Sequence, residues 1–223
     1  MHRIAIYDMD KTITRAPTWT RFLVHFAWSH APLRLLLLPA AGALAAGHPL
    51  RLIDRARLKQ ATHRLLIGAR TSPEQLARAA DDFARRERER GMFADALARI
   101  AADRAAGYRI VIATASHRFY AGAIAALVGA DALVATEARH DSRGRVLARL
   151  AGANCYGAAK LDAITAWLTA AHIARGDAHI RFYSDHVSDA PALGWADEGF
   201  VVNPDAGLAR LAAARGWTRL DWR

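Results

Sequence analysis

Two pairs of carboxylates follow apolar runs near opposite ends of the chain. Asp8 and Asp10 come directly after one such run, and Asp185 and Asp189 come directly after another. Apolar runs of this length are typical of buried strands, and carboxylate oxygens are the ligands that a hard cation prefers. A pair of acids alone is a weak signal, because acids are common in surface turns. The two pairs together predict a cation site where two strands end.

A hydroxyl and an ammonium group lie between the two pairs in the sequence. Thr114 follows the apolar segment 108–113, and Lys160 lies in a segment of helical pattern. Both groups suit an anionic oxygen ligand. Taken alone, Thr114 could simply satisfy the backbone hydrogen bonds at a strand end, and Lys160 could be an exposed helix residue. Lysine is scarce here, since only three of the 31 basic residues are lysines. Two of the three, Lys11 and Lys160, lie in the segments that carry the candidate site residues. This favours a functional role for these lysines over a chance placement.

The elements that would position these groups alternate between strand and helix. Alternation of this kind predicts a parallel sheet covered by helices on both faces. Ligands of such sheets bind beyond the carboxyl ends of the strands, where Asp8, Thr114 and Asp185 are expected. The pattern predicts strands at 3–8, 108–113, 132–135, 179–184 and 199–202, and helices at 119–128, 158–173, 189–195 and 205–215.

Residues 14–106 are expected to be almost entirely helical, and 137–150 to form a hairpin that turns at 141–144. Ser72 and Pro73 mark a helix start, and the charge-rich run 85–90 is expected to be a solvated face. The longest uncharged stretch, 35–50, has 16 residues and contains two prolines and two glycines. It is too short to span a bilayer. We expect a buried helix there; a membrane-surface contact stays open because arginines flank the stretch.

Composition limits the function classes. With 53% hydrophobic residues in 223, the chain is expected to fold rather than to be disordered. Lys+Arg minus Asp+Glu is 31 − 21 = +10, so the protein attracts anions without choosing among them. Arginines scattered among acids argue against a nucleic-acid-binding stripe. The single cysteine, Cys155, excludes an intrachain disulfide and, with no leader-like segment at the start, fits a cytoplasmic location.

The order of these motifs resembles the haloacid dehalogenase (HAD) superfamily of phosphohydrolases. The motifs are D-M-D-K-T at 8–12, T-A-S at 114–116, Lys160, and S-D-H-V-S-D at 184–189. The insertion after the first motif is similar to the phosphoserine-phosphatase-like subgroup, subfamily IB. The resemblance implies a Rossmann-like α/β core at 1–13 plus 107–223, and a C1-type helical cap at 14–106.

The resemblance also implies roles for the carboxylates and the lysine. Asp8 would be the nucleophile that forms an aspartyl-phosphate, and Asp10 the general acid and base. Asp8, the backbone carbonyl of Asp10, and Asp185 would hold Mg²⁺. Lys160 would pair with Asp8 and the transferring phosphoryl group, and Asp189 would orient Lys160 or a metal-bound water.

The remaining implied roles concern phosphate binding. Thr12 would brace Asp10, and Thr114 would donate its hydroxyl to a phosphoryl oxygen. Backbone amides of the Ala115–Ser116 turn would assist at a helix start. His186, between the last two acids, is read as a peripheral turn histidine rather than a metal ligand.

The chain departs from phosphoserine phosphatases at the position that meets the substrate amine. Those enzymes carry a glutamate soon after the first motif, whereas this chain has no acid from residue 13 to 53. A more anionic phosphate monoester is therefore favoured over phosphoserine. The apolar stretch resembles that of phosphatidylglycerophosphatase C, a member of the subgroup, which keeps a lipid phosphate as an alternative. Transfer to an acceptor other than water and a non-catalytic basic binding module also stay open, and no oligomeric state is predicted.

Overall fold

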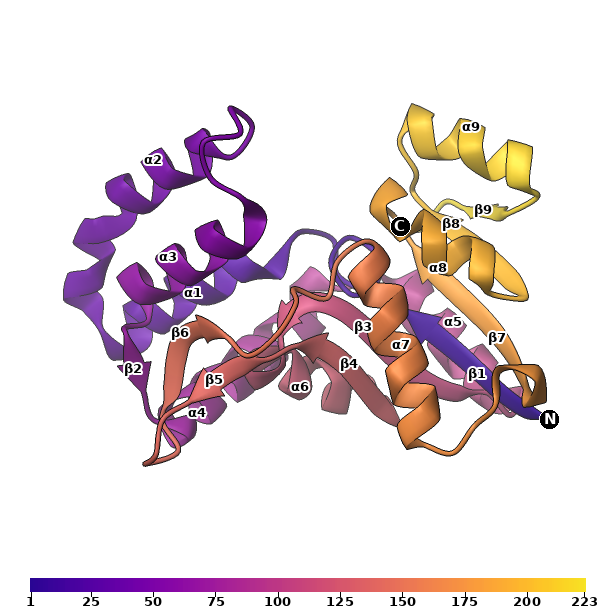
Figure 1. The fold of residues 1–223 in the computed structure, drawn as a ribbon, viewed down its shortest axis with the longest axis horizontal. Helices are drawn as coiled ribbons and strands as arrows, with labels where there is room; N and C mark the ends of the chain where they lie inside the picture. The colour runs from indigo at the N-terminus through magenta and orange to yellow at the C-terminus, as the bar shows by residue number, and fades with distance from the viewer.

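The computed structural model describes all residues 1–223, and its centre is a six-stranded, wholly parallel sheet (Figure 1). The strand order is β4-β3-β1-β7-β8-β9. The strands are β1 (His2–Tyr7), β3 (Arg109–His117), β4 (Ala132–Thr136), β7 (Ala178–Ser184), β8 (Glu198–Val202) and β9 (Thr218–Leu220). The α/β fold expected from the sequence is confirmed, and five of the six strands lie where the apolar runs predicted them.

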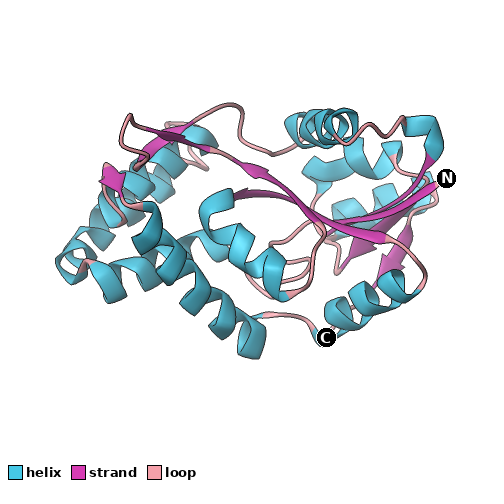
Figure 2. Cartoon of the chain, turned by 90° about the horizontal axis from the view of Figure 1, so that it is seen from below, coloured by secondary structure: helices cyan, strands magenta, loops and turns pink.

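Helices cover both faces of this sheet (Figure 2). One face packs against α5 (Ala94–Ala105) and α6 (Arg118–Leu127), and the other against α7 (Ala158–Ala170), α8 (Ala190–Trp195) and α9 (Ala206–Arg215). Successive residues of β1 point to opposite faces: Ile4 and Ile6 join the apolar cluster under α7–α9, whereas Ala5 and Tyr7 join the cluster under α5 and α6. Two-sided burial explains why the strands read as continuous apolar runs.

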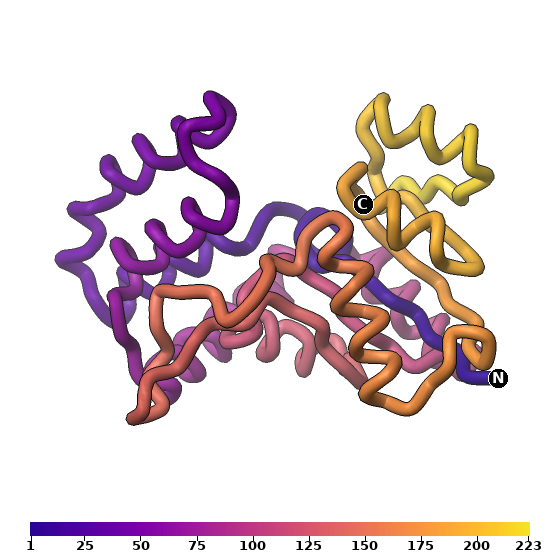
Figure 3. Tube along the Cα trace, in the orientation of Figure 1, coloured from indigo at the N-terminus to yellow at the C-terminus, as the bar shows by residue number.

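The chain leaves the sheet after β1 and returns to it at β3 (Figure 3). Between them, ahead of α5, come α1 (Thr18–His30), the 3₁₀ helix η1 (Pro32–Leu37), α2 (Leu38–Gly47), α3 (Arg55–Leu66), β2 (Arg70–Thr71), α4 (Pro73–Arg86) and the π-helical turn η2 (Glu87–Gly91). The expected helix start is confirmed, since the Ser72 hydroxyl accepts a hydrogen bond from the Gln75 amide at 3.2 Å. The expectation of an almost entirely helical segment overlooked β2.

The short strand β2 pairs with a hairpin that comes from the far side of the sequence. The hairpin consists of β5 (Ala138–His140) and β6 (Val146–Leu150), as predicted, and β2 pairs antiparallel with β6. These three strands lie together at the end of the molecule away from the N-terminus (Figure 1).

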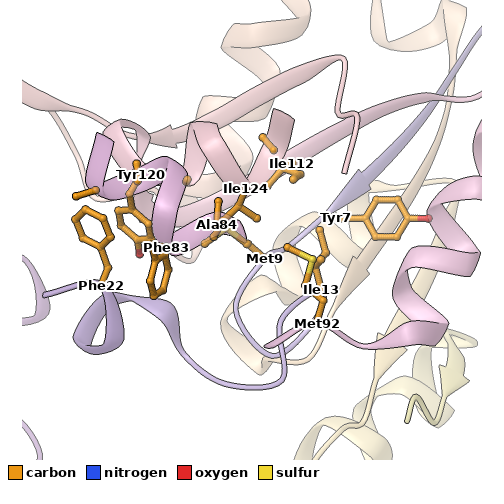
Figure 4. Packing of buried hydrophobic residues seen from close by; sticks show 14 of the residues in the cluster. Tyr7, Met9, Ile13, Phe22, Phe83, Ala84, Met92, Ile112, Tyr120 and Ile124 are labelled. Atoms are coloured by element: carbon orange, nitrogen blue, oxygen red, sulfur yellow. The ribbon is translucent and has the colours of Figure 1, made fainter. Parts of the chain in front are cut away.

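A single apolar cluster joins the sheet to the insertion (Figure 4). Ile112 from β3 and Ile124 from α6 belong to it, as do Phe22 from α1 and Phe83 from α4. Tyr120 of α6 stacks on Phe22 with ring centroids 4.5 Å apart. Because α1 and α4 share this buried cluster with α6, they are fixed against the sheet rather than merely tethered to it.

Two expectations about the insertion are wrong. The stretch 35–50 does not form a buried helix, because Ala41 is the only buried residue of α2 and η1 has none. No helix is both long and apolar enough to cross a bilayer. The charge-rich run 85–90 is not wholly solvated either: Glu87 is buried and pairs with Arg21 of α1 at 2.6 Å. Gly91 leaves room for this carboxylate, since a Cβ there would lie 2.1 Å from Glu87 Oε2.

Candidate active site

A cavity of about 280 Å³ opens at the edge of the sheet where β1 and β7 end, beside the last residues of β3. Most of the residues predicted from the sequence line it together, although they come from four separate segments. The lining residues are Asp8, Asp10, Lys11, Pro17, Arg55, Thr114, Ala115, Tyr156, Lys160, Asp185, His186, Ser188 and Asp189. The predicted residues Thr12 and Ser116 are buried beside the cavity and do not line it.

Lys160 lies between two carboxylates at the base of the cavity. Its Nζ donates to Asp8 Oδ1 at 2.7 Å and to Asp189 Oδ2 at 2.6 Å. The hydroxyl of Ser184, the last residue of β7, donates to the same Asp189 oxygen at 2.7 Å. Lys160 sits in the first turn of α7, which follows Gly157 at φ 62°, a conformation that glycine adopts without strain. This turn aims the lysine at the end of β1.

The cluster has more buried negative than positive charge. Burial raises the pKa of Asp8, and the nearby Asp189 and Asp185 add to the rise against the opposing pull of Lys160. Burial alone would lower the pKa of the Lys160 ammonium, but Asp8 and Asp189 outweigh it and raise that pKa. Burial also raises the pKa of Asp185, to about 6. The lysine is therefore held as a cation, and the carboxylates lack a further positive charge.

These residues fit a Mg²⁺ ion. No three acidic, histidine or cysteine side chains converge closely enough to hold a metal by themselves. Mg²⁺ commonly binds through one or two carboxylates and keeps several waters, and the predicted set of two carboxylates and the Asp10 carbonyl is of that kind. The excess buried negative charge beside Asp8 and Asp185 is the feature that a divalent cation would offset.

Thr12 braces a different acid from the one expected. Its Oγ1 accepts the backbone N–H of Asp185 at 3.0 Å and lies 3.5 Å from Asp185 Oδ1. The expectation that Thr12 braces Asp10 is therefore wrong, because Thr12 is fully buried beneath the β7 end instead of facing the Asp10 carboxylate.

Asp10 is held by Thr18 of the insertion and by Ser116 of β3. Its Oδ1 accepts the backbone N–H of Thr18 at 2.8 Å and the Thr18 hydroxyl at 2.7 Å. Its Oδ2 accepts the Ser116 hydroxyl at 3.0 Å, and Ser116 in turn accepts from Tyr120 at 2.6 Å. Since Thr18 begins α1, the positive end of that helix faces the carboxylate. This network orients Asp10 from both sides.

The T-A-S segment lies inside β3, not beyond its end. The strand continues to His117, and its register with β4 shifts between Thr114 and His117. Thr114 Oγ1 accepts the Ser116 amide at 3.0 Å, which leaves its hydroxyl hydrogen free to donate into the cavity. The irregularity turns Thr114 and Ala115 toward the site while Ser116 points to Asp10.

Two residues of α3, Arg55 and Lys59, reach the site, and neither was expected there from the sequence. The Arg55 guanidinium lines the cavity and lies 4.1 Å from the centre of the Tyr156 ring, with no carboxylate partner. Lys59, one turn later, donates to the Ala115 carbonyl and to Asn154 Oδ1 at 2.6 Å, and burial lowers its pKa to about 8. Lysine scarcity was a signal for Lys59, whereas nothing distinguished Arg55 among the many arginines.

Known structures share the overall fold of this chain. A crystal structure of a protein of unknown function from Bordetella pertussis superposes with a TM-score of 0.88 at 26% identity, covering 99% of both chains. A probable phosphoserine phosphatase from Vibrio cholerae shares the fold, with a TM-score of 0.70 at 12% identity over 99% of this chain and 60% of that one.

Sequence relatives and a family profile add to the structural matches. A probable phosphatase of Mycobacterium tuberculosis is 35% identical over 131 residues, which are 59% of this chain and 44% of that protein. The matched segment spans about half of the length of the curated relatives that this chain resembles. The profile of haloacid dehalogenase-like hydrolases matches residues 5–194. The chain therefore belongs to the haloacid dehalogenase-like hydrolase family.

Proposed function

We propose that this protein is a Mg²⁺-dependent phosphatase that hydrolyses a phosphate monoester through an aspartyl-phosphate on Asp8. The observation that carries the proposal is the buried Asp8–Lys160–Asp189 cluster, which shares one cavity with Asp10. Family membership and the probable phosphatase among the relatives support it. The structural likeness to a probable phosphoserine phosphatase supports subfamily IB, with the core at 1–13 plus 107–223 and the cap at 14–106.

The positions of the side chains suggest a separate catalytic role for each. Lys160 holds Asp8 Oδ1, so Oδ2, which has no hydrogen-bond partner, would attack phosphorus. As the bond from phosphorus to the leaving oxygen breaks, Asp10 would give that oxygen a proton. Asp10 would then take a proton from the water that attacks phosphorus and releases Asp8. Lys160 and the Thr114 hydroxyl would stabilise the charge that develops on the phosphoryl oxygens.

Bound Mg²⁺ would supply the charge that lets a carboxylate approach a dianionic phosphate. Asp8, Asp185 and the Asp10 carbonyl would hold it, and Thr12 would fix Asp185 through its backbone amide. Asp189 would keep Lys160 in place, since its Oδ2 accepts both the ammonium and the Ser184 hydroxyl.

Arg55 supports a substrate with a second anionic group. It lines the same cavity as Asp8, stacks on Tyr156 and has no carboxylate partner, so its planar fork is available to a carboxylate or phosphate. No acid between residues 13 and 53 offers a partner for a substrate amine. We therefore favour a small, water-soluble phosphate monoester with a further negative charge as the substrate. We also propose that the protein acts in the cytoplasm.

A membrane-peripheral lipid phosphatase is the second candidate, favoured by one specific feature. Leu33, Leu36, Leu50 and Leu52 are 82%, 78%, 69% and 79% exposed, around the uncharged helix α2. Exposed apolar surface of this kind is unusual in a monomer and commonly marks an interaction site. Hydrolysis of phosphatidylglycerophosphate in vesicles, at a higher rate than any soluble monoester, would favour this candidate.

The test of phosphatase activity uses p-nitrophenyl phosphate with and without Mg²⁺, and Asp8→Asn as the control. We expect Mg²⁺-dependent release of phosphate by the parent protein and none by the variant. No release by the parent would instead favour a non-catalytic basic binding module. Equal release by the variant would show that Asp8 is not the nucleophile. A screen of phosphorylated metabolites and lipids would then identify the substrate class.

A further inference from the structure

Four arginines line a second cavity that is separate from the catalytic one. The cavity measures about 580 Å³, lies where α3 ends against β2 and β6, and shares no residue with the catalytic cavity. Its lining consists of Arg34, Arg64, Ala69, Arg70, Leu147, Ala148 and Arg149. No acidic side chain is among them, so the walls carry positive charge alone.

None of the four guanidinium groups forms an ion pair. By contrast, Arg145, which is on the same hairpin as Arg149, pairs with Asp141 at 2.8 Å. Arg34 is nevertheless fixed in place, because its Nη1 donates to the carbonyls of Arg64 at 3.1 Å and Leu65 at 2.9 Å. It satisfies the end of α3 with one nitrogen and keeps its other donors free.

Strand pairing brings two more of the arginines together. Arg70 of β2 lies directly opposite Leu147 of β6. Since side chains alternate along a strand, Arg149 is on the same face as Leu147 and diagonal to Arg70. Diagonal neighbours in antiparallel strands are separated by roughly 7–8 Å, which long side chains bridge. The two guanidinium groups can therefore reach one ligand placed between them.

We infer that this cavity binds a multivalent oxyanion of phosphate type. Like charges that converge without a counterion repel one another, and an anion removes that repulsion. Guanidinium forks match phosphate oxygens with paired hydrogen bonds. The ligand connects three arginines of residues 14–106 with Arg149 of the hairpin, so binding ties the helical insertion to the hairpin. The site is independent of the proposed catalysis.

The anion has two sources, a free polyanion or the headgroup of an anionic lipid. The vesicle arm is included because Arg34 lies between the exposed Leu33 and Leu36. A free polyanion is tested by calorimetric titration of the protein with sodium tripolyphosphate. EDTA is present so that no Mg²⁺ offsets the carboxylates of the catalytic cavity, which then disfavour anion binding there. The lipid arm is co-sedimentation with phosphatidylcholine vesicles, with and without phosphatidylglycerol.

Two double variants distinguish the contribution of the cavity arginines to anion binding from that of the net charge of the protein. Arg70→Gln/Arg149→Gln removes two cavity arginines. Arg139→Gln/Arg143→Gln removes the same amount of charge from the hairpin that carries Arg149, at exposed side chains that have no partners and do not line the cavity. The single variants Arg70→Gln and Arg149→Gln serve if the cavity double variant does not fold.

We expect the cavity double variant to bind tripolyphosphate about tenfold or more weakly than the parent, and the control double variant to stay within about twofold. Vesicle binding that requires phosphatidylglycerol and is lost only in the cavity variant also supports the site, with a lipid headgroup as the source. The inference is overturned if the parent binds neither probe, or if the control variant loses as much affinity as the cavity variant.

Discussion

Replacement of Lys160 by methionine tests the buried charge cluster directly. Lys160 is 2% exposed and is the only cation in contact with Asp8 and Asp189. Methionine keeps most of the length and the apolar stem but removes the ammonium. Two carboxylates would then be buried without a cationic partner, although Asp189 would keep the Ser184 hydroxyl. This is far more costly than the loss of an exposed ion pair.

The expected loss of stability is large. Breaking a buried pair by removal of one partner costs about 3–5 kcal/mol. The loss should be smaller in an Asp8→Asn background, because only Asp189 then remains charged, and a coupling of about 1–3 kcal/mol is expected for groups in contact. Mg²⁺ should stabilise the Lys160→Met variant by about 2.7 kcal/mol at a concentration a hundredfold above its dissociation constant.

Urea unfolding of the four proteins in EDTA, repeated with Mg²⁺, measures these quantities. The parent, Asp8→Asn, Lys160→Met and the double variant form one thermodynamic cycle. Phosphatase turnover of Lys160→Met should also fall by about a hundredfold to a thousandfold, as expected for loss of one donor to developing charge. A stability loss under about 1 kcal/mol, or the same loss in both backgrounds, would refute the pairing of Lys160 with Asp8.

Three further predictions concern the surroundings of the site. Burial lowers the pKa of His63 from 6.5 to about 4, so between those pH values the unfolded chain binds a proton that the folded protein does not. Stability should therefore fall by about 3 kcal/mol as the pH drops through that window, and urea unfolding of His63→Asn should show a shallower fall. Thr18→Val removes a hydroxyl that orients Asp10, and turnover should drop about tenfold with KM little changed; an unchanged turnover would exclude that role. Arg55→Gln should raise KM about tenfold or more for substrates with a second anionic group and leave KM for p-nitrophenyl phosphate unchanged; equal effects on both would contradict its proposed contact.

The sheet was predictable from sequence because burial on both faces leaves a signal in every strand. Residues 108–113 and 179–184 read as apolar runs, and both form central strands. The acids that follow β1 and β7 could be placed at one edge because parallel strands end on the same side. The strand β9 (Thr218–Leu220) gave no such signal, since it is a short edge strand that is largely exposed.

The features that sequence missed depend on contacts between distant segments. The β2 strand exists because β6 pairs with it, 75 or so residues later in the chain. Glu87 looks like part of a solvated charge run, but Arg21 and the space left by Gly91 make its burial favourable. Helix α2 is uncharged, and composition alone does not tell whether another element covers it. The presence or absence of contacts with distant segments decided each of these cases.

The packing of the insertion also limits how the catalytic cavity can open. Phe22 of α1 and Phe83 of α4 belong to the same buried cluster as Ile112 of the sheet, so a hinge between these helices and the sheet would expose that cluster. Residues 32–47 have one buried side chain, Ala41, and segments with few buried contacts open at low free energy. This loosely packed stretch leads through a turn to Arg55, which lines the cavity. Access for substrate is therefore expected from motion of the segment before α3, with α1, α4 and the sheet as the fixed frame.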